Sequence, residues 1–230
     1  MQLEFRLVPV AAGTPASDIT VNIDQFIVGG WAGRNREAIE HHIEELAELG
    51  VPRPSAIPLY YRIASDQLTQ ADTIQVVGDQ TSGETEVLLF NHQGEHCISL
   101  VSDHTDRALE AHSVALSKQI CAKPVGRTAW RLADVADHWD SLVLKAWIEE
   151  DGREVRYQDD SVSALRHPEA LMRGHFDAER IPADAAMSCG TVGAIGGIRP
   201  STHFIMVLSD PVLKRELRHE YHVQVLPEIA

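Results

Sequence analysis

The sequence predicts a single α+β domain that is rich in β-structure. Three observations lead to this fold class. Several segments alternate apolar and polar residues, one strongly amphipathic helix pattern lies near the N-terminus, and several connections are too short for parallel crossovers, which favours a mostly antiparallel sheet. The 230 residues fit one domain, because no Gly/Ser-rich or Pro-rich linker divides them. Within it we expect an N-terminal lobe over residues 1–63 and a larger body over residues 64–230.

The N-terminal lobe begins with strands and continues into a helix. Residues 2–8 alternate apolar and polar side chains, and residues 19–29 predict one or two short strands. From residue 35 to residue 49 the spacing becomes helical, and Gly50 marks the helix end. The apolar stripe of this helix is formed by Ile39, Ile43, Leu46 and Leu49. The Pro-rich residues 51–58 follow as an extended loop.

The larger body is predicted to be mostly strands, with two further helices. We expect strands at 73–77, 84–90, 96–101, 139–149, 153–157, 203–208 and 221–226, with a turn at Asp151-Gly152. We expect helices at 105–120 and 168–173.

Composition and charge exclude several classes of function. The formal net charge is −14, from 34 acidic against 20 basic residues, which argues against nucleic-acid and anionic membrane partners. No apolar run approaches the ~20 residues that cross a bilayer, and the first residues do not resemble a signal peptide. The three cysteines, Cys97, Cys121 and Cys189, are far apart, which is typical of reduced thiols in a cytoplasmic protein.

Carboxylates in two neighbouring predicted strands could hold a metal ion. Glu84 and Glu86 lie two residues apart in a strand, so their side chains point to the same face. Asp103 directly follows the strand 96–101. Oxygen-rich groups of this kind bind Mg²⁺ or Ca²⁺. Taken separately, the two glutamates are explained as well by an exposed strand start, and Asp103 by a cap at a helix N-terminus.

Three further groups have polar side chains or backbone that could take part in chemistry. His42 and Glu45 are three apart on one helix face, as a general base and its orienting carboxylate would be, although a surface pair has the same spacing. Lys118 could stabilise a negatively charged oxygen, or it could be a solvated lysine at a helix end. The segment 189–197 lacks the spacing of a dinucleotide-binding loop, so its alternatives are backbone contact with a ligand or a Gly-rich turn.

Taken in order, these segments resemble the fumarylacetoacetate hydrolase superfamily. The resemblance spans residues 25–226 and rests on Gly33-Arg34-Asn35, His42-x-x-Glu45, Pro52-Arg53-Pro54, Glu84-x-Glu86, Ser102-Asp103-His104-Thr105-Asp106-Arg107, Lys118, Pro124-Val125-Gly126 and Gly190-Thr191. Ser102, His104 and Val192 depart from the residues usual in that family, which is typical of a distant branch.

The resemblance implies a rolled, mixed β-sheet in the form of a pseudo-barrel, with a few peripheral helices, usually in a homodimer. It implies a divalent ion, Mg²⁺ or Mn²⁺ with Ca²⁺ as an alternative, on Glu84, Glu86 and Asp103. Lys118 would stabilise an enolate oxygen. The substrate would be oriented by Gly190 and Thr191, with Arg34 adding charge for an acidic group. His42 and Glu45 would activate water or move a proton when their helix closes as a lid.

For function, the resemblance implies a metal-dependent hydrolase that cleaves a C–C bond of an acylpyruvate-like keto-acid or 1,3-dicarbonyl compound through a metal-stabilised enolate. Decarboxylation, hydration and isomerisation on the same scaffold stay open. Two alternatives lie outside enzymology: a catalytically inactive protein that binds a small molecule, and a structural scaffold without a metal. The complete set of three carboxylates argues against both.

Overall fold

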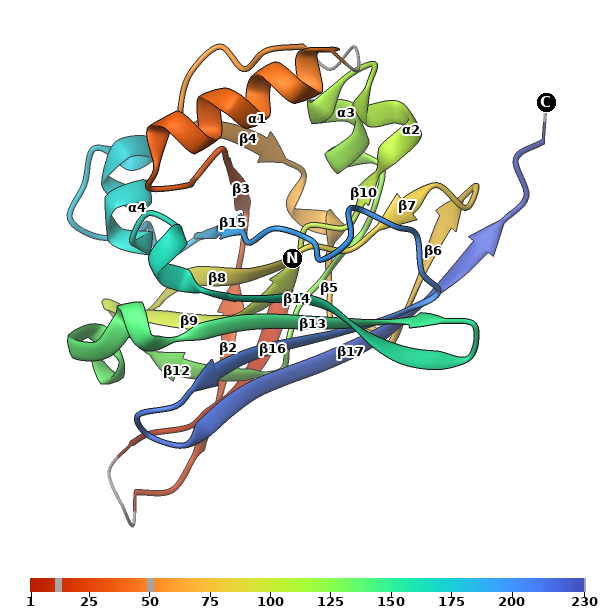
Figure 1. The fold of residues 1–230 in the computed structure, drawn as a ribbon. Helices are drawn as coiled ribbons and strands as arrows, with labels where there is room; N and C mark the ends of the chain where they lie inside the picture. Colours follow the sequence, from red (N-terminus) through yellow and green to blue (C-terminus); the bar gives the residue numbers. More distant parts are fainter. Residues whose placement is uncertain (11–13, 49–51, 230) are drawn as a thin grey trace.

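The structure, a computed structural model, describes residues 1–10, 14–48 and 52–229. Its strands form two main sheets (Figure 1). The larger sheet has eight strands in the order β2-β1-β12-β9-β8-β15-β3-β4, and the smaller has five in the order β14-β13-β16-β17-β6. Two short pairs, β10-β7 and β11-β5, lie beside them.

In chain order the strands are β1 (Gln2–Leu7), β2 (Ser17–Asn22), β3 (Gln25–Gly30), β4 (Leu59–Ile63), β5 (Leu68–Thr69), β6 (Thr73–Val77), β7 (Thr81–Ser82), β8 (Thr85–His92), β9 (Glu95–Ser102), β10 (Thr105–Asp106), β11 (Lys123–Pro124), β12 (Thr128–Arg131), β13 (Val143–Glu150), β14 (Arg153–Ser161), β15 (Ala185–Thr191), β16 (His203–Asp210) and β17 (Arg215–Leu226). The α-helices are α1 (Arg36–Glu48), α2 (Arg107–Glu110), α3 (Val114–Gln119) and α4 (Pro168–Phe176). Short 3-10 helices are η1 (Ser65–Gln67), η2 (Leu132–Asp134), η3 (Ala136–Ser141) and η4 (Val162–Ala164).

Strand β8 lies at the centre of the molecule and is buried on both faces. Val87 and Leu89 pack into a core shared with the five-stranded sheet, whereas Leu88 and Phe90 pack into a second core with β1, β2 and β3. The second core is enclosed because the eight-stranded sheet curls around it. Most strand pairs are antiparallel, while β1 with β12 and β3 with β15 run parallel, so the sheet is mixed. The predicted β-rich α+β fold with a rolled sheet is therefore confirmed.

The helices gather along one side of the eight-stranded sheet, at the top of Figure 1. Helix α1 begins after Asn35, whose side-chain oxygen accepts a hydrogen bond from Ala38 N at 3.2 Å. Ile39 and Ile43 are buried, as the predicted stripe requires. The last predicted residue of the helix, Leu49, and its expected end at Gly50 lie outside the described residues, as does the side chain of Leu46.

Several predicted boundaries were wrong. The single helix expected at 105–120 is strand β10 followed by α2 and α3, because Asp106 and Ser113 each accept a hydrogen bond from the backbone N–H three residues later and so start a new helix. The strand expected at 139–149 begins only at Val143, since η3 occupies the preceding residues. Strands β4, β12 and β15 were not predicted, and β17 is longer than expected.

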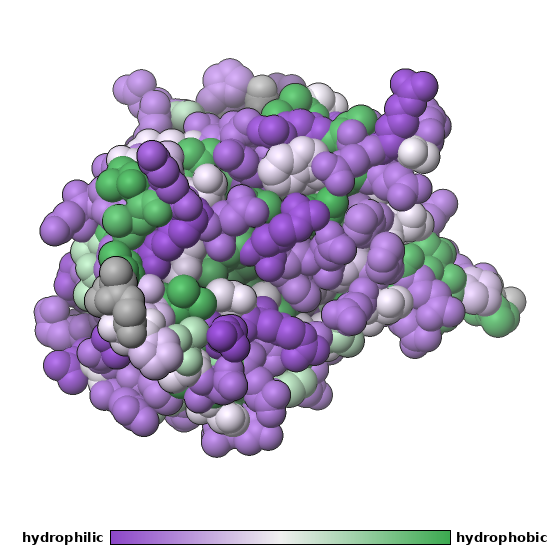
Figure 2. All heavy atoms as spheres, turned by 90° about the horizontal axis from the view of Figure 1, so that it is seen from below, coloured by the Kyte–Doolittle hydropathy of each residue, from purple (hydrophilic) through white to green (hydrophobic). Residues whose placement is uncertain are grey.

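The surface agrees with the acidic, polar composition. Figure 2 shows a face that is mostly hydrophilic, with apolar residues in separate small patches. The larger exposed apolar side chains include Val77, Val225 and Ile229, near the C-terminal end. No helix among the described residues is long and apolar enough to cross a membrane.

Candidate metal centre

Two paired strands bring three carboxylates together. Glu84 directly precedes β8, Glu86 lies within it, and Asp103 directly follows β9, which pairs with β8. Asp103 N donates to Glu84 O at 3.0 Å, so the two segments stay in contact beyond the end of the ladder. One carboxylate oxygen from each of the three residues lies within 4.8 Å of the others, and this is the one such group of three among the described residues.

The carboxylates are held against buried cations. Glu86 is 3% exposed and Asp103 is 1% exposed, so the alternative of solvated glutamates at a strand start does not hold for Glu86. Lys118 Nζ lies 2.5 Å from Asp103 Oδ2, and Lys123 Nζ lies 3.2 Å from Asp103 Oδ1. Lys118 is therefore a buried ion-pair partner and not a solvated lysine at a helix end.

Arg107 performs the same task for the third carboxylate. Its Nη2 lies 2.9 Å from Glu84 Oε1, and its Nη1 lies 2.9 Å from Glu110 Oε2. Its Nε donates to Ser82 Oγ at 2.7 Å, which fixes the plane of the guanidinium. Each of the three carboxylates thus has a different set of neighbours, and Glu86 is the one without an ion pair among those described.

The pKa values follow from these neighbours. Burial raises the pKa of Glu86 to about 8, and the negative charges of Asp103 and Glu84 add to the rise. Burial would raise the pKa of Asp103 as well, but Lys118 and Lys123 outweigh it and hold that pKa at about 2. Burial lowers the pKa of Lys123, whereas Asp103 and Glu84 more than offset burial at Lys118 and raise its pKa.

A divalent cation fits this set of residues. Three hard oxygen donors converge, as Mg²⁺ and Mn²⁺ require. Asp103 Oδ1 is buried and accepts no hydrogen bond from the described residues, so it has an unused lone pair. A cation would also favour the ionised form of Glu86, which burial otherwise opposes.

Gly190 and Thr191 contact the carboxylate segment from strand β15. Gly190 N donates to Glu86 Oε2 at 2.9 Å. Gly190 has a φ of +87°, and a Cβ there would lie 2.7 Å from Ala32 Cβ, so only glycine fits. The Thr191 hydroxyl donates to Thr85 O at 2.8 Å and accepts from Gln158 Nε2 at 2.8 Å. Both residues hold the β8 segment in place, and their contact with a substrate stays a prediction.

Arg34 makes its printed contacts elsewhere in the molecule. Its guanidinium donates to both carboxylate oxygens of Asp140, at 2.8 and 2.5 Å, and to Leu165 O at 2.6 Å. It lines a cavity of about 370 Å³ together with residues 136–141 and His167. Substrate binding by Arg34 stays a prediction, and it would require the pair with Asp140 to open.

Helix α1 carries the two predicted proton-transfer residues. Positions 42 and 45 lie within its helical turns. The side chains of His42 and Glu45 lie outside the part of the chain that the structure describes. Their proposed role as a dyad therefore stays a prediction.

Sequence reasoning missed several residues around the carboxylates. Lys123 was visible next to Pro124, but nothing local distinguishes a buried lysine from a solvated one. Tyr61 lies close by, with Lys118 Nζ 5.9 Å from its ring centre and Trp31 Nε1 3.4 Å from its hydroxyl. Burial lowers the pKa of His104 to about 3, so this fully buried ring is neutral and acts through hydrogen bonds.

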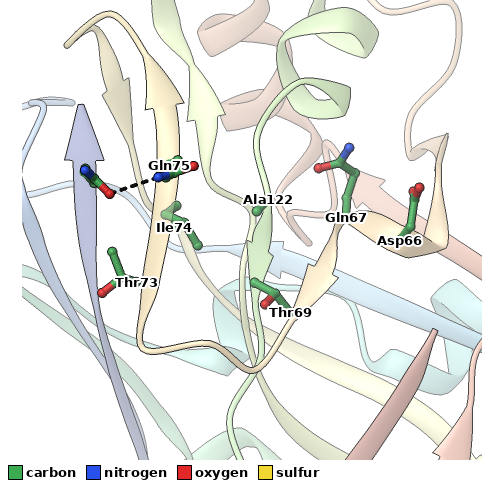
Figure 3. Close-up of a pocket in the computed structure, with 8 residues that line it drawn as sticks. Asp66, Gln67, Thr69, Thr73, Ile74, Gln75 and Ala122 are labelled. Carbon is green, nitrogen blue, oxygen red and sulfur yellow. Dashed lines mark hydrogen bonds between the residues drawn. The ribbon is translucent and has the colours of Figure 1, made fainter. Parts of the chain in front are cut away.

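Other candidate features are less suited to catalysis. The three cysteines are unpaired and buried, and burial raises the pKa of Cys97 to about 12 and of Cys121 to about 11, so neither thiol is ionised at neutral pH. A surface cavity of about 440 Å³ lies between β5 and β6 (Figure 3). Glutamine and threonine side chains dominate its lining, and none of the three carboxylates takes part in it.

Comparisons with known proteins agree with the fold. A family model described as "Protein of unknown function (DUF2848)" matches residues 29–221. No curated protein matches the sequence. A solved structure of 2-keto-3-deoxyarabinonate dehydratase superposes with a TM-score of 0.62 at 16% identity, covering 90% of this chain and 76% of that one. Cg1458 superposes with a TM-score of 0.57 at 14% identity, covering 90% and 78%.

A further structure is 2-keto-3-deoxy-D-arabinonate dehydratase complexed with magnesium and 2,5-dioxopentanoate. It superposes with a TM-score of 0.61 at 14% identity, and the match covers 95% of this chain and 80% of that one. At these identities the likeness establishes a shared fold.

Proposed function

The chain belongs to the DUF2848 family, and we propose that it is a divalent-metal-dependent enzyme acting on a small keto-acid, on a distant branch of the fumarylacetoacetate hydrolase superfamily. The observation that carries the proposal is the convergence of Glu84, Glu86 and Asp103 within 4.8 Å, with Lys118 on the same aspartate. Similarity of fold to a dehydratase solved with magnesium and 2,5-dioxopentanoate supports the metal and the substrate class.

The charges of the centre favour an anionic substrate. Four carboxylates, counting Glu110, lie against three cations, Arg107, Lys118 and Lys123. A divalent cation turns this balance from one net negative to one net positive charge. In a buried site such an excess favours a ligand with a single negative charge, as a keto-acid has near neutral pH.

The residues of this chain would divide the work as follows. A bound Mg²⁺ or Mn²⁺ supplies Lewis acidity, which makes the carbon next to a carbonyl group more acidic. Glu84, Glu86 and Asp103 would hold it, with Gly190 N–H orienting the Glu86 carboxylate. The Lys118 ammonium would stabilise negative charge that develops on the substrate oxygen. His42, oriented by Glu45, would move a proton at the reacting carbon or activate water.

Hydrolytic cleavage of a C–C bond in an acylpyruvate-like substrate is the reaction that we propose first. It uses the water-activating role of the His42 and Glu45 pair. Dehydration of a sugar-derived 2-keto acid is the second candidate, because two of the similar folds described above are 2-keto-3-deoxyarabinonate dehydratases. Both reactions begin with proton movement next to a keto group.

A panel of 2-oxo acids tests the proposal. We expect purified protein to turn over at least one acylpyruvate or 2-keto-3-deoxy acid, to lose this activity with EDTA and to regain it with Mg²⁺ or Mn²⁺. Glu86→Gln should abolish turnover while leaving the protein folded. Activity that survives either treatment unchanged would eliminate the mechanism. Product analysis by mass spectrometry separates hydrolysis from dehydration.

The same experiment separates an enzyme from an inactive binding protein. Thermal stabilisation by metal and oxalate without turnover of any keto-acid on the panel would favour binding only. A homodimer and a cytoplasmic location remain predictions of the family resemblance. Mass photometry of the purified chain tests the first of these.

A further inference from the structure

One tyrosine hydroxyl joins the two sheets directly beside the carboxylates. Tyr221 lies in β17 of the five-stranded sheet and is fully buried. Its oxygen lies 2.8 Å from Ser102 Oγ and 2.9 Å from His104 Nδ1. Ser102 and His104 are the residues on either side of Asp103, so the hydroxyl bridges the backbone that carries this carboxylate.

The same hydrogen-bond network reaches the segment that carries the glutamates. Ser102 Oγ accepts from Glu84 N at 3.3 Å, and His104 Nε2 lies 2.9 Å from Thr81 Oγ1. A Cβ on Gly83 would lie 2.5 Å from the Tyr221 oxygen, so this oxygen packs directly against the backbone before Glu84. The hydroxyl therefore contacts both ligand-carrying segments at once.

The network is specific in its chemistry. Ser102 and His104 both depart from the residues usual in the resembling family, and together with Tyr221 and Thr81 they form a polar cluster that the described side chains satisfy internally. An apolar residue at position 104 would leave the Tyr221 hydroxyl with one partner fewer. Because buried polar groups lose stability when a partner is removed, these residues depend on one another.

We propose that Tyr221 is a positioning residue of the metal centre: its hydroxyl, held between Ser102 and His104, sets the spacing between the segments that carry Glu84 and Asp103. It does so without touching the metal. The inference rests on the proposed function, because it assumes that these carboxylates hold a divalent cation. Groups that orient metal ligands from outside typically contribute 10–100-fold to metal affinity.

Tyr221→Phe tests this role because it keeps the ring and removes only the oxygen. The readout is Mn²⁺ affinity by isothermal titration calorimetry, at a temperature where circular dichroism shows each variant to be folded. We expect the dissociation constant for Mn²⁺ to rise about 10-fold or more. Tyr60→Phe is the matched control. It removes a hydroxyl that donates to Leu171 O at 3.0 Å and has no printed contact with residues 81–86 or 102–104, so we expect unchanged Mn²⁺ affinity.

Ser102→Ala and Ser102→Thr keep the test decisive if the tyrosine variant does not fold. Ser102→Ala breaks the link between Tyr221 and Glu84 N and should weaken Mn²⁺ binding similarly, whereas Ser102→Thr keeps a hydroxyl and should restore it. Unchanged Mn²⁺ affinity in Tyr221→Phe or in Ser102→Ala would overturn the positioning role alone. Wild-type protein that binds no Mn²⁺ would overturn the proposed function and this inference together.

Discussion

The protonation of Glu86 should make metal binding depend on pH. The pKa of this carboxyl is raised to about 8 by burial and by two neighbouring carboxylates. A cation binds the ionised form, so binding must displace a proton at any pH below that value. A glutamate with an ordinary pKa near ~4.3 would already be ionised from pH 6 to pH 8 and would contribute no such dependence.

The magnitude follows from the fraction of ionised carboxylate. With a pKa of about 8, Glu86 is about half ionised at pH 8 and about 1% ionised at pH 6. The apparent affinity for Mn²⁺ should therefore fall about 50-fold from pH 8 to pH 6, a change of about 2.3 kcal/mol at ~1.4 kcal/mol per factor of ten. Nearly all of the fall lies below pH 7.5.

Isothermal titration calorimetry with Mn²⁺ at pH 6, 7 and 8 measures this change. Buffers with different ionisation enthalpies also count the protons released, and we expect close to one per metal ion at pH 6. Glu86→Gln is the control, since the metal binding that it retains should be weaker and independent of pH in this range. Dissociation constants that agree within a factor of two at pH 6 and pH 8 in the wild type would refute the reasoning.

The same carboxyl makes a second, opposite prediction for stability. Its folded-state pKa is raised, so without metal the folded protein binds a proton more tightly than the unfolded chain does between about pH 4.5 and pH 8. Metal-free protein should therefore lose stability as pH rises through this window. Saturating Mn²⁺ should reverse the trend, because it binds only the ionised folded form. Urea unfolding at several pH values, with and without metal, checks the sign.

Three substitutions test other parts of the structure. Gly190→Ala forces a side chain into a left-handed backbone position and should lower the free energy of unfolding by about 2 kcal/mol, measured by urea unfolding; an unchanged midpoint would contradict the steric argument. Lys123→Met removes a buried cation beside Asp103 and should cost about 3 kcal/mol in the same assay, whereas a solvated lysine would cost almost nothing. Arg34→Ala breaks a largely exposed pair with Asp140, so stability should change by less than about 1 kcal/mol. A raised KM for the keto-acid in this variant would support substrate binding by Arg34, and an unchanged KM would exclude it.

The carboxylates could be foreseen from sequence because strand geometry is regular. Alternation places Glu84 and Glu86 on one face, and the short connection after residue 92 makes the next strand its antiparallel neighbour, which brings Asp103 close. The helix at 36–48 could be foreseen for a similar reason, since its apolar stripe repeats at helical spacing. Both predictions depend only on local periodicity and on pairing between adjacent strands.

The remaining features depend on contacts that local patterns do not encode. Strand β15 was missed because Ala185, Ala186 and Cys189 are small and have little β-propensity, although burial on both faces makes them suitable there. Lys123 and Tyr221 reach the centre through tertiary packing, from segments distant in the chain. A lysine next to a proline and a tyrosine in an alternating strand have no local signal for such a role.

The pairing of acids with buried cations affects when the ion can enter. Where a structural ion alone offsets clustered acids, the chain cannot fold before the ion arrives. Here Arg107, Lys118 and Lys123 already offset most of the repulsion, so we expect the polypeptide to reach its native shape first and to take up its ion afterwards. The proportion of active molecules would then follow the supply of free magnesium or manganese, without new synthesis of the protein.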